Sequence, residues 1–214
     1  MLEIKKLDIG YSDNLLIKNS NFIFEPGRVY SIVGNNGSGK TSLLRTIIGF
    51  IPALNGSVLV NNDCIANWSL VKKSTVFSVL FSRNDIDPNV TVRELLNFSL
   101  GDFFTNVEDS EQYKSLVTYF SVDNLLDKPF RYMSDGQKQI VLIARLFLKP
   151  ANIYLMDEPT IYLDVRTKNL LNAFIKQFIA QNDAVIIFIS HDKSFVEDIS
   201  DVTLAVNAGS LVRQ

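Results

Sequence analysis

The sequence predicts an α/β fold with a mostly parallel sheet, and three observations support this prediction. Short apolar runs with strand character recur along the chain, and helical patterns lie between them. The nearly alternating segment 2–9 and the apolar segment 22–24 indicate a small N-terminal antiparallel sheet before the first run. Residues of about 85–148 are helical in pattern and lack a convincing strand. The apolar runs are 29–33, 76–81, 153–156 and 184–189.

We predict a single domain, because 214 residues suffice for one α/β core with an inserted subdomain. Residues 1–84 and 149–214 would form this core, and about 85–148 would form the helical subdomain. Thr91 and Glu94 have the form of a capping box at the start of a helix. A second, amphipathic helix is predicted from apolar residues at helical spacing: Tyr113, Leu116, Val117 and Phe120.

Composition excludes several classes of protein. Hydrophobic residues make up 47% and charged residues 21% of the chain, which is ordinary for a soluble globular protein. The net charge of −2 gives no reason to expect a nucleic-acid partner. No apolar stretch approaches the roughly 20 residues that span a bilayer, and the N-terminus lacks a secretion signal. Cys64 is the only cysteine, so no internal disulfide forms and a cytosolic location is expected.

Residues 34–41 match the phosphate-binding pattern G-x-x-x-x-G-K-[ST] at every fixed position. A buried strand at 28–33 precedes this loop, and a helix at 42–48 follows it and stops at Gly49. In that setting the glycines bring backbone N–H groups round a phosphate at a helix N-terminus. We therefore predict that the chain binds a nucleoside triphosphate. The predicted binding residues are Gly34, Asn35, Asn36, Gly37, Ser38, Gly39, Lys40, Thr41 and Ser42.

Two acids follow the strand predicted at 153–156. Asp157 and Glu158 would lie at the carboxyl edge of the sheet, where bound phosphates are expected. Asp157 is suited to hold Mg²⁺ directly or through water. Glu158, one residue further on, is suited to polarise an attacking water.

A second helix start has the chemistry to contact a phosphate. Ser134 and Gln137 have capping-box spacing, and the predicted helix continues through Leu148. Its first turn offers free N–H groups, the positive end of the helix dipole and a hydroxyl. In isolation this pattern indicates no more than a well-formed helix start.

Together these motifs resemble those of the nucleotide-binding subunits of ATP-binding cassette (ABC) transporters, over residues 2–212. In that family the signature Leu-Ser-Gly-Gly-Gln completes the ATP site across a head-to-tail dimer. Here residues 133–137 read Met-Ser-Asp-Gly-Gln, with two substitutions. The resemblance implies a P-loop NTPase (RecA-like) fold, ATP and Mg²⁺ as ligands, and a role for Ser134, Gly136 and Gln137 at the ATP of a second copy.

The resemblance assigns further roles to single residues. His191 directly follows the strand at 184–190, where the family places a switch histidine that contacts the γ-phosphate and the catalytic glutamate. Tyr11 stands where the family stacks an aromatic side chain on adenine. Asp164 matches the segment that joins the two subunits across the dimer. Lys40 would contact the β- and γ-phosphates.

Thr41 and Asp157 are the expected Mg²⁺ ligands, but one family residue is missing. The family has a glutamine between the phosphate loop and the signature, and this chain has none between Thr41 and Glu111. Ser82 lies at or near that position. Its hydroxyl can ligate Mg²⁺ or hold a water, although it is about two bonds shorter than a glutamine amide.

The function expected from the resemblance is an ATP-hydrolysing transporter subunit at the cytoplasmic face of a membrane. Its partners would be a second copy or a related subunit, and polytopic permease subunits that contact a groove near residues 82–89. Two alternatives are a soluble ABC-type ATPase of translation or DNA repair, and a nucleotide-gated module that barely hydrolyses ATP. Asp135 replaces a signature glycine, and this variant resembles one seen among importers of iron complexes and cobalamin. The alternative to such uptake is export of a small molecule or lipid.

Overall fold

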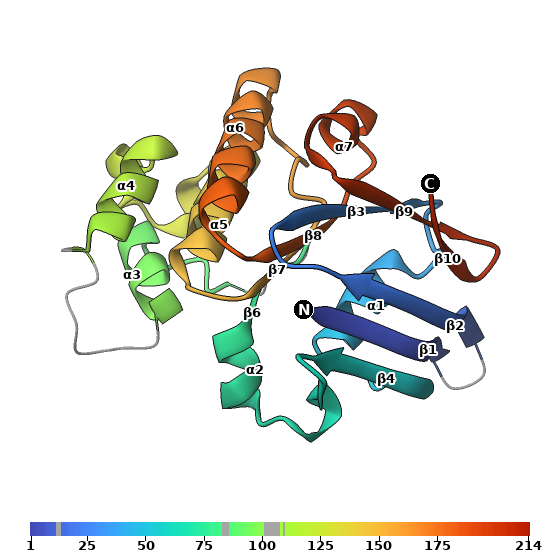
Figure 1. Ribbon diagram of the computed structural model, residues 1–214. Helices are drawn as coiled ribbons and strands as arrows, with labels where there is room; N and C mark the ends of the chain where they lie inside the picture. The colour runs from blue at the N-terminus through green and yellow to red at the C-terminus, as the bar shows by residue number, and fades with distance from the viewer. Residues whose placement is uncertain (12–13, 83–85, 101–107, 109) are drawn as a thin grey trace.

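Two β-sheets of different kinds form the frame of the computed structural model (Figure 1). The structure describes residues 1–11, 14–82, 86–100, 108 and 110–214. The smaller sheet is antiparallel and has the strand order β2-β1-β4-β5. Its strands are β1 (Leu2–Tyr11), β2 (Asn14–Phe24), β4 (Asn55–Val60) and β5 (Asp63–Cys64). The N-terminal antiparallel sheet is therefore confirmed, with β4 and β5 as additions that the sequence pattern did not indicate.

The larger sheet has the strand order β10-β9-β3-β8-β7-β6. All neighbouring strands in it are parallel except β9 and β10, which are antiparallel. A mostly parallel sheet was predicted and is confirmed. Its strands are β3 (Arg28–Gly34), β6 (Phe77–Leu80), β7 (Ile153–Asp157), β8 (Val185–Ile189), β9 (Val202–Asn207) and β10 (Ser210–Arg213).

Helices connect these strands. The loop after β3 leads into α1 (Lys40–Ile47), which begins before the predicted start at residue 42. The other α-helices are α2 (Leu70–Val76), α3 (Val92–Asn97), α4 (Glu111–Tyr119), α5 (Asp135–Leu148), α6 (Val165–Gln181) and α7 (Lys193–Ile199). Short 3-10 turns are η1 (Ile65–Asn67), η2 (Phe98–Leu100), η4 (Asp123–Leu125) and η5 (Phe130–Tyr132).

The hydrophobic core lies on both faces of the larger sheet, because alternate strand residues point to opposite faces. Tyr154 and Ile186 pack with buried side chains of α5, α6 and α7. Ile153 and Val185, their neighbours in β7 and β8, pack with α1 and the smaller sheet. Strands that are buried on both faces read as continuous apolar runs, which is why β7 and β8 were predicted from sequence.

Helices α3 and α4, which follow β6 in the chain, lie at one end of the molecule, and α5 lies beside α6 (Figure 1). The capping box predicted at Thr91 and Glu94 is present at the start of α3. The amphipathic helix is α4, which buries Tyr113, Leu116 and Val117. Both predictions of local structure are therefore confirmed.

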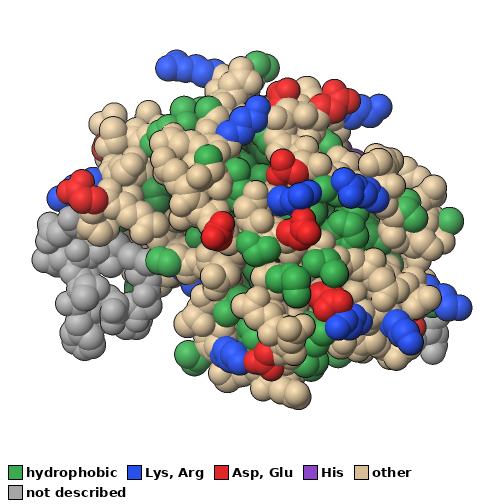
Figure 2. All heavy atoms as spheres, in the orientation of Figure 1, with side chains coloured by type: hydrophobic (Ala, Val, Ile, Leu, Met, Phe, Trp, Pro, Cys, Tyr) green, Lys and Arg blue, Asp and Glu red, His purple; other side chains and the backbone are tan. Residues whose placement is uncertain are grey.

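Among the described residues, no helix combines the length and apolar character that a membrane span requires. On the face in Figure 2, Lys and Arg side chains are interspersed with Asp and Glu, as expected for a chain with net charge −2. Exposed hydrophobic side chains occur on the surface as well, among them Leu70 and Val71 of α2.

Phe147 is the centre of an aromatic cluster that holds α5 and α6 on the sheet. Its fully buried ring lies 5.3 Å from Tyr154, 4.8 Å from Phe174 and 4.9 Å from Phe178, measured between ring centroids. We predict that Phe147→Ala lowers the free energy of unfolding by about 3–5 kcal/mol, because it leaves a cavity that these rings cannot fill. Urea unfolding measures this loss. The exposed Val165→Ala should change it by less than about 0.5 kcal/mol, and an equal effect of both changes would contradict the prediction.

Candidate functional site

The phosphate-loop sequence forms a tight turn between β3 and α1. Gly34, Gly37 and Gly39 have positive φ angles of 150°, 77° and 101°, a region that favours glycine. A Cβ atom on Gly34 would lie 2.7 Å from the backbone oxygen of Val206, so glycine is required there for packing. A Cβ atom on Gly37 would meet no atom within 4 Å. The loop is therefore open on this side of Gly37, where a ligand can approach its backbone.

Lys40 is the cation at the centre of this loop. Its ammonium donates hydrogen bonds to the backbone oxygens of Gly34 at 2.8 Å and Asn35 at 2.9 Å. Burial lowers the pKa of Lys40, and the carboxylates of Glu158 and Asp157 oppose this effect. The structure thus holds a partly desolvated cation at a helix N-terminus, which is an anion-binding arrangement.

One buried polar atom in the loop supports a phosphate ligand. The hydroxyl oxygen of Ser38 is buried and has no hydrogen-bond partner among the residues that the structure describes. Buried polar groups are normally paired, so an orphan of this kind requires an explanation. A phosphate oxygen would accept a hydrogen bond from the Ser38 hydroxyl. The residues present therefore fit a nucleoside triphosphate.

Asp157 is the last residue of β7, and its buried carboxylate joins three segments of the chain. It accepts hydrogen bonds from the hydroxyl of Thr41 at 3.1 and 3.3 Å and from the hydroxyl of Ser82 at 3.1 Å. A carboxylate and two hydroxyls are hard oxygen donors of the kind that Mg²⁺ binds together with substrate phosphates. The described residues contain no group of three or more His, Cys, Asp or Glu side chains that could hold a metal. The donor set therefore fits a Mg²⁺ ion that is completed by phosphates and water.

Glu158 follows with a strained backbone, at φ 56°. Its backbone N–H donates to Ile189 O at 2.9 Å, which fixes the turn after β7. One carboxylate oxygen lies 3.4 Å from Nε2 of His191, and the other accepts a hydrogen bond from the His191 backbone N–H at 3.3 Å. Burial raises the pKa of Glu158, while the neighbouring His191 acts to lower it. The pairing expected from the resemblance is thus present in the geometry.

Tyr11 lies at the end of β1 with half of its surface exposed. Its phenol oxygen is 3.2 Å from the hydroxyl of Ser42 at the start of α1. The ring is therefore held beside the phosphate loop by a single polar contact, and it keeps an exposed face.

These side chains meet in one cavity of about 890 Å³. It brings together most of the residues that were predicted to bind ATP and Mg²⁺ or to act in catalysis. The predicted residues that line it are Tyr11, Asn36, Gly37, Gly39, Lys40, Thr41, Ser42, Ser82, Asp157, Glu158 and His191.

The signature residues lie elsewhere. Ser134, Gly136, Gln137 and Asp164 line a second cavity of about 1000 Å³. The capping box of Ser134 and Gln137 is present, with N···O distances of 3.1 and 3.2 Å. One chain therefore does not bring its signature to its own phosphate loop.

The two cavities share the segment after Glu158. Tyr162 and Leu163 line both of them. A Cβ atom on Gly136 would lie 2.9 Å from the backbone oxygen of Tyr162, so the first turn of α5 packs closely on this segment. Gln139, buried in α5, donates to the backbone oxygen of Pro159 at 2.9 Å. The signature helix is thus fixed to the segment that carries the acids.

Sequence reasoning missed Lys168, which lines the first cavity. Its ammonium lies 2.6 Å from the carboxylate of Asp192, directly after His191. This hydrogen bond holds the pKa of Asp192 below its usual range. Lys168 therefore anchors the loop that carries the histidine. The pair links two distant parts of the sequence, and no local pattern signals it.

Comparisons with known proteins agree with this geometry. A family model described as ABC transporter matches residues 17–161. An uncharacterised ABC transporter ATP-binding protein of Sinorhizobium fredii (strain NBRC 101917 / NGR234) is 29% identical over 99% of this chain and 62% of its own length. The thiamine import ATP-binding protein of Vibrio cholerae serotype O1 (strain ATCC 39315 / El Tor Inaba N16961) is 28% identical over 86% of this chain and 77% of its own.

A solved dimeric structure, a post-hydrolysis state of an ATP-binding cassette bound to ADP and Pi, superposes with a TM-score of 0.88. The match covers 100% of this chain and 98% of the other at 20% identity, so it shows the fold alone. The chain spans about half to three-fifths of the length of several curated relatives that it matches, with values of 62%, 58% and 48%.

Glu158 gives a prediction on the pH dependence of stability. The pKa of Glu158 is higher in the folded chain than in the unfolded chain. The free energy of unfolding therefore falls as the pH rises from the unfolded pKa through the folded pKa, where the buried carboxyl ionises. Glu158→Gln lacks this effect. The melting temperature of the variant minus that of the original chain should therefore be larger at pH 7.5 than at pH 4. Thermal melts of the nucleotide-free proteins test this, with the exposed Glu197→Gln as the matched control. A stability difference that stays constant with pH would contradict the prediction.

Proposed function

The chain belongs to the ABC transporter family, and on that premise we propose that it is the ATP-binding and ATP-hydrolysing subunit of a membrane transporter. The observation that carries this proposal is the meeting of four groups in one cavity. Lys40, Thr41, Asp157 and Glu158 supply a cation, a hydroxyl and two carboxylates beside the phosphate loop. This is the set of groups that phosphoryl transfer from a nucleotide requires.

In the proposed reaction the phosphate loop binds and orients ATP. The ammonium of Lys40 exchanges its bonds to Gly34 and Asn35 for phosphate oxygens, and backbone N–H groups of residues 37–42 contact the same phosphates. The exposed face of the Tyr11 ring stacks on adenine. Thr41, Asp157 and Ser82 would hold a Mg²⁺ ion, which would supply positive charge beside the phosphates.

Glu158 and His191 prepare the attack of water in this proposal. The carboxylate of Glu158 lies beside Asp157 at the mouth of the phosphate loop, where it can orient a water and accept its proton. His191 holds the carboxylate through its ring and its backbone N–H. Lys168 positions His191 through Asp192, so the imidazole keeps its place while the charges change.

A second copy completes the site. The residues Ser134, Gly136 and Gln137 line a different cavity from Lys40 of the same chain, and this separation supports a head-to-tail dimer in which they cover the partner copy's ATP. Asp164 lies beside them at the start of α6, where it would contact the second subunit. ATP binding would close the dimer, and hydrolysis would open it.

The remaining partners in this proposal are polytopic permease subunits. The closing of the dimer would move them at the cytoplasmic face of a membrane. Residues 85–148 would form the helical subdomain that receives them. Within the predicted contact segment 82–89, residues 83–85 lie outside those the structure describes. Uptake of a small solute is the proposed direction, supported by the similarity to a thiamine import protein. Asp135, the basis for expecting an iron complex or cobalamin, is exposed, and its carboxylate lies 3.5 Å from the ammonium of Lys138. An iron complex or cobalamin as cargo stays a prediction.

The role of Glu158 is testable by kinetics. Glu158→Gln should lower ATP turnover by at least ~10²-fold, because the amide cannot accept a proton from water, while the affinity for ATP stays within about threefold. Steady-state phosphate release and equilibrium nucleotide binding measure the two quantities. The exposed Glu197→Gln should retain full turnover. Unchanged turnover in the Glu158 variant would refute the role.

The dimer is testable with a charge placed at the signature. In a Glu158→Gln background, MgATP should convert the monomer to a dimer, measured by light scattering. Adding Ser134→Glu should prevent this conversion, because a carboxylate at the exposed start of α5 would repel the partner's phosphates. Ser69→Glu is the matched control, since Ser69 also caps a helix and is exposed. Dimer formation by both variants would contradict the arrangement.

A further inference from the structure

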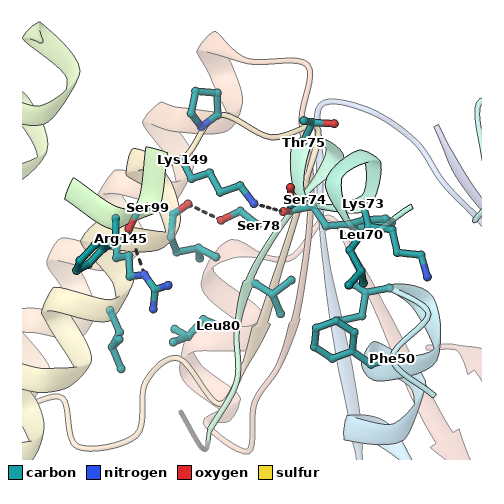
Figure 3. Close-up of a pocket in the computed structure, with 17 residues that line it drawn as sticks. Phe50, Leu70, Lys73, Ser74, Thr75, Ser78, Leu80, Ser99, Arg145 and Lys149 are labelled. Carbon is teal, nitrogen blue, oxygen red and sulfur yellow. Dashed lines mark hydrogen bonds between the residues drawn. The ribbon is translucent and has the colours of Figure 1, made fainter. Parts of the chain in front are cut away.

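The chain reaches Ser82 by passing beyond the end of a sheet ladder. The last residue pair between β6 and β7 is Leu80 with Met156, and β6 is the edge strand of the larger sheet. Phe81 and Ser82 follow this pair. Figure 3 looks into the neighbouring cavity and shows Leu80 near the end of β6, with Phe50 on the segment that follows α1. The ladder therefore ends before the hydroxyl that was predicted to bind Mg²⁺.

One face of α1 lies against the segment that carries this hydroxyl. Every residue of α1 is buried except Thr41 and Arg45. These two residues are four positions apart, so they lie on the same face of the helix. The hydroxyls of Thr41 and Ser82 meet at the Asp157 carboxylate, each at 3.1 Å from Oδ2. One helical turn further on, Cζ of Arg45 lies 5.4 Å from the ring centroid of Phe81. Two neighbouring residues of the segment are thus held against α1.

The contact of Arg45 with Phe81 has the geometry of a cation–π interaction. A cation within about 6 Å of a ring centroid is attracted by the negative face of the ring. Arg45 forms no ion pair with a carboxylate of the described residues, so no acid among them competes with the ring for the guanidinium. The ring of Phe50 lies 6.0 Å from that of Phe81 between centroids. The half-buried Phe81 side chain therefore has contacts with a cation and with a second ring.

The position of the backbone at Ser82 matters because the serine side chain is short. Mg²⁺ requires oxygen ligands at about 2.0–2.1 Å in near-octahedral geometry. A glutamine could compensate for a displaced backbone by changing its rotamer, whereas a serine hydroxyl moves with the backbone. Groups that orient the ligands of a metal are known to change its affinity. Contacts that fix the segment 81–82 should therefore affect how strongly Mg²⁺ binds.

We propose that Arg45 is a positioning residue for Mg²⁺, because its contact with the Phe81 ring places the Ser82 hydroxyl beside Thr41 and Asp157. The proposal rests on the proposed function, which includes binding of MgATP. It adds the residues that hold a short Mg²⁺ ligand in place where the glutamine of the family is missing.

Arg45 has one alternative role, which the test must separate from the first. It lies in the last turn of α1, where a cation interacts favourably with the helix dipole. That interaction stabilises the fold, but it involves neither the Phe81 ring nor Mg²⁺. A change at Phe81 and a change in the Mg²⁺ concentration therefore distinguish the two roles.

The gain in nucleotide affinity that Mg²⁺ provides tests this proposal. The gain is the Kd in EDTA divided by the Kd at saturating Mg²⁺, measured on the monomeric chain for an ATP analogue with an NH group between its β- and γ-phosphates. We expect it to fall at least ~3-fold in Arg45→Gln and in Phe81→Leu. Phe81→Tyr keeps the ring and should retain the gain, as should the matched control Arg213→Gln at an exposed position of β10.

A double-mutant cycle tests whether Arg45 acts through Ser82. Ser82→Ala should itself lower the gain, because it removes the proposed ligand. Adding Arg45→Gln to Ser82→Ala should cause little further loss, since no hydroxyl remains to be positioned. The affinity in EDTA should stay within about twofold of the original in every variant, which shows that each one is folded.

Hydrogen exchange of the nucleotide-free chain provides a readout without metal or activity. Loss of the contact should speed the exchange of a peptide that spans residues 77–82 by at least ~3-fold in Arg45→Gln and Phe81→Leu. Peptides from α6 should exchange at the original rate, because α6 does not contribute to this contact.

Several results would overturn the proposal. An unchanged gain in both variants would do so, and a loss in Arg45→Gln that Phe81→Leu does not reproduce would assign Arg45 to the helix dipole. An equal loss of affinity in EDTA and in Mg²⁺ would show a structural role, and losses that add to that of Ser82→Ala would show that Ser82 is not involved. In all these cases nucleotide binding by the original chain leaves the proposed function intact. An original chain that binds no nucleotide would instead refute that function, so the two failures are distinguishable.

Discussion

The hydrogen bonds to the Asp157 carboxylate are the interaction on which the rest of the site depends. Thr41 comes from the start of α1, Ser82 from the segment after β6, and the acid itself from the end of β7. These segments meet because the carboxyl ends of parallel strands lie at one edge of a sheet. The register that pairs Asp157 with Ile189 also places Glu158 against His191. A slip of one residue in β7 would turn the carboxylate to the other face and remove every one of these contacts.

The parts of the fold that could be predicted from sequence are those with a strong local signal. The glycines of the phosphate loop, the buried strands and the capping boxes each follow from the backbone chemistry of a few neighbouring residues. Helix α2 was missed because it buries no residue, so it has no apolar period to detect. Strands β4 and β5 were missed because their pairing depends on the distant β1. The contact of Lys168 with Asp192 is likewise set by tertiary packing.

The distinction between local sequence signals and tertiary contacts also applies to the signature helix start, the part of the candidate site that lies apart from the phosphate loop. Sequence spacing identified the signature helix, yet only the structure reveals how its first turn is held. Gly136 must be small because the backbone of Tyr162 approaches it, and Gln139 bonds to Pro159 behind it. Both contacts tie the start of α5 to the segment after Glu158 in the same chain. The first turn of α5 consequently lines a cavity that Lys40 does not line, which is the arrangement that a second copy would complete.

Under the proposed function, helix α5 would offer a route from the ATP of the partner copy to the far end of the helix that does not require the missing glutamine. The hydroxyl of Ser82 is engaged with the Asp157 carboxylate. By contrast, the 14 residues of α5 begin after Ser134 and end at Leu148, a span of about 21 Å. Its start would face the partner copy's ATP. Arg145 in its last turn and Lys149 directly after it line a cavity beside α2 and β6. An α-helix moves as a rigid body when its core face is well packed, as Phe147 ensures here. A shift that ATP imposes on the first turn of α5 would therefore be carried to Arg145 and Lys149 at its other end.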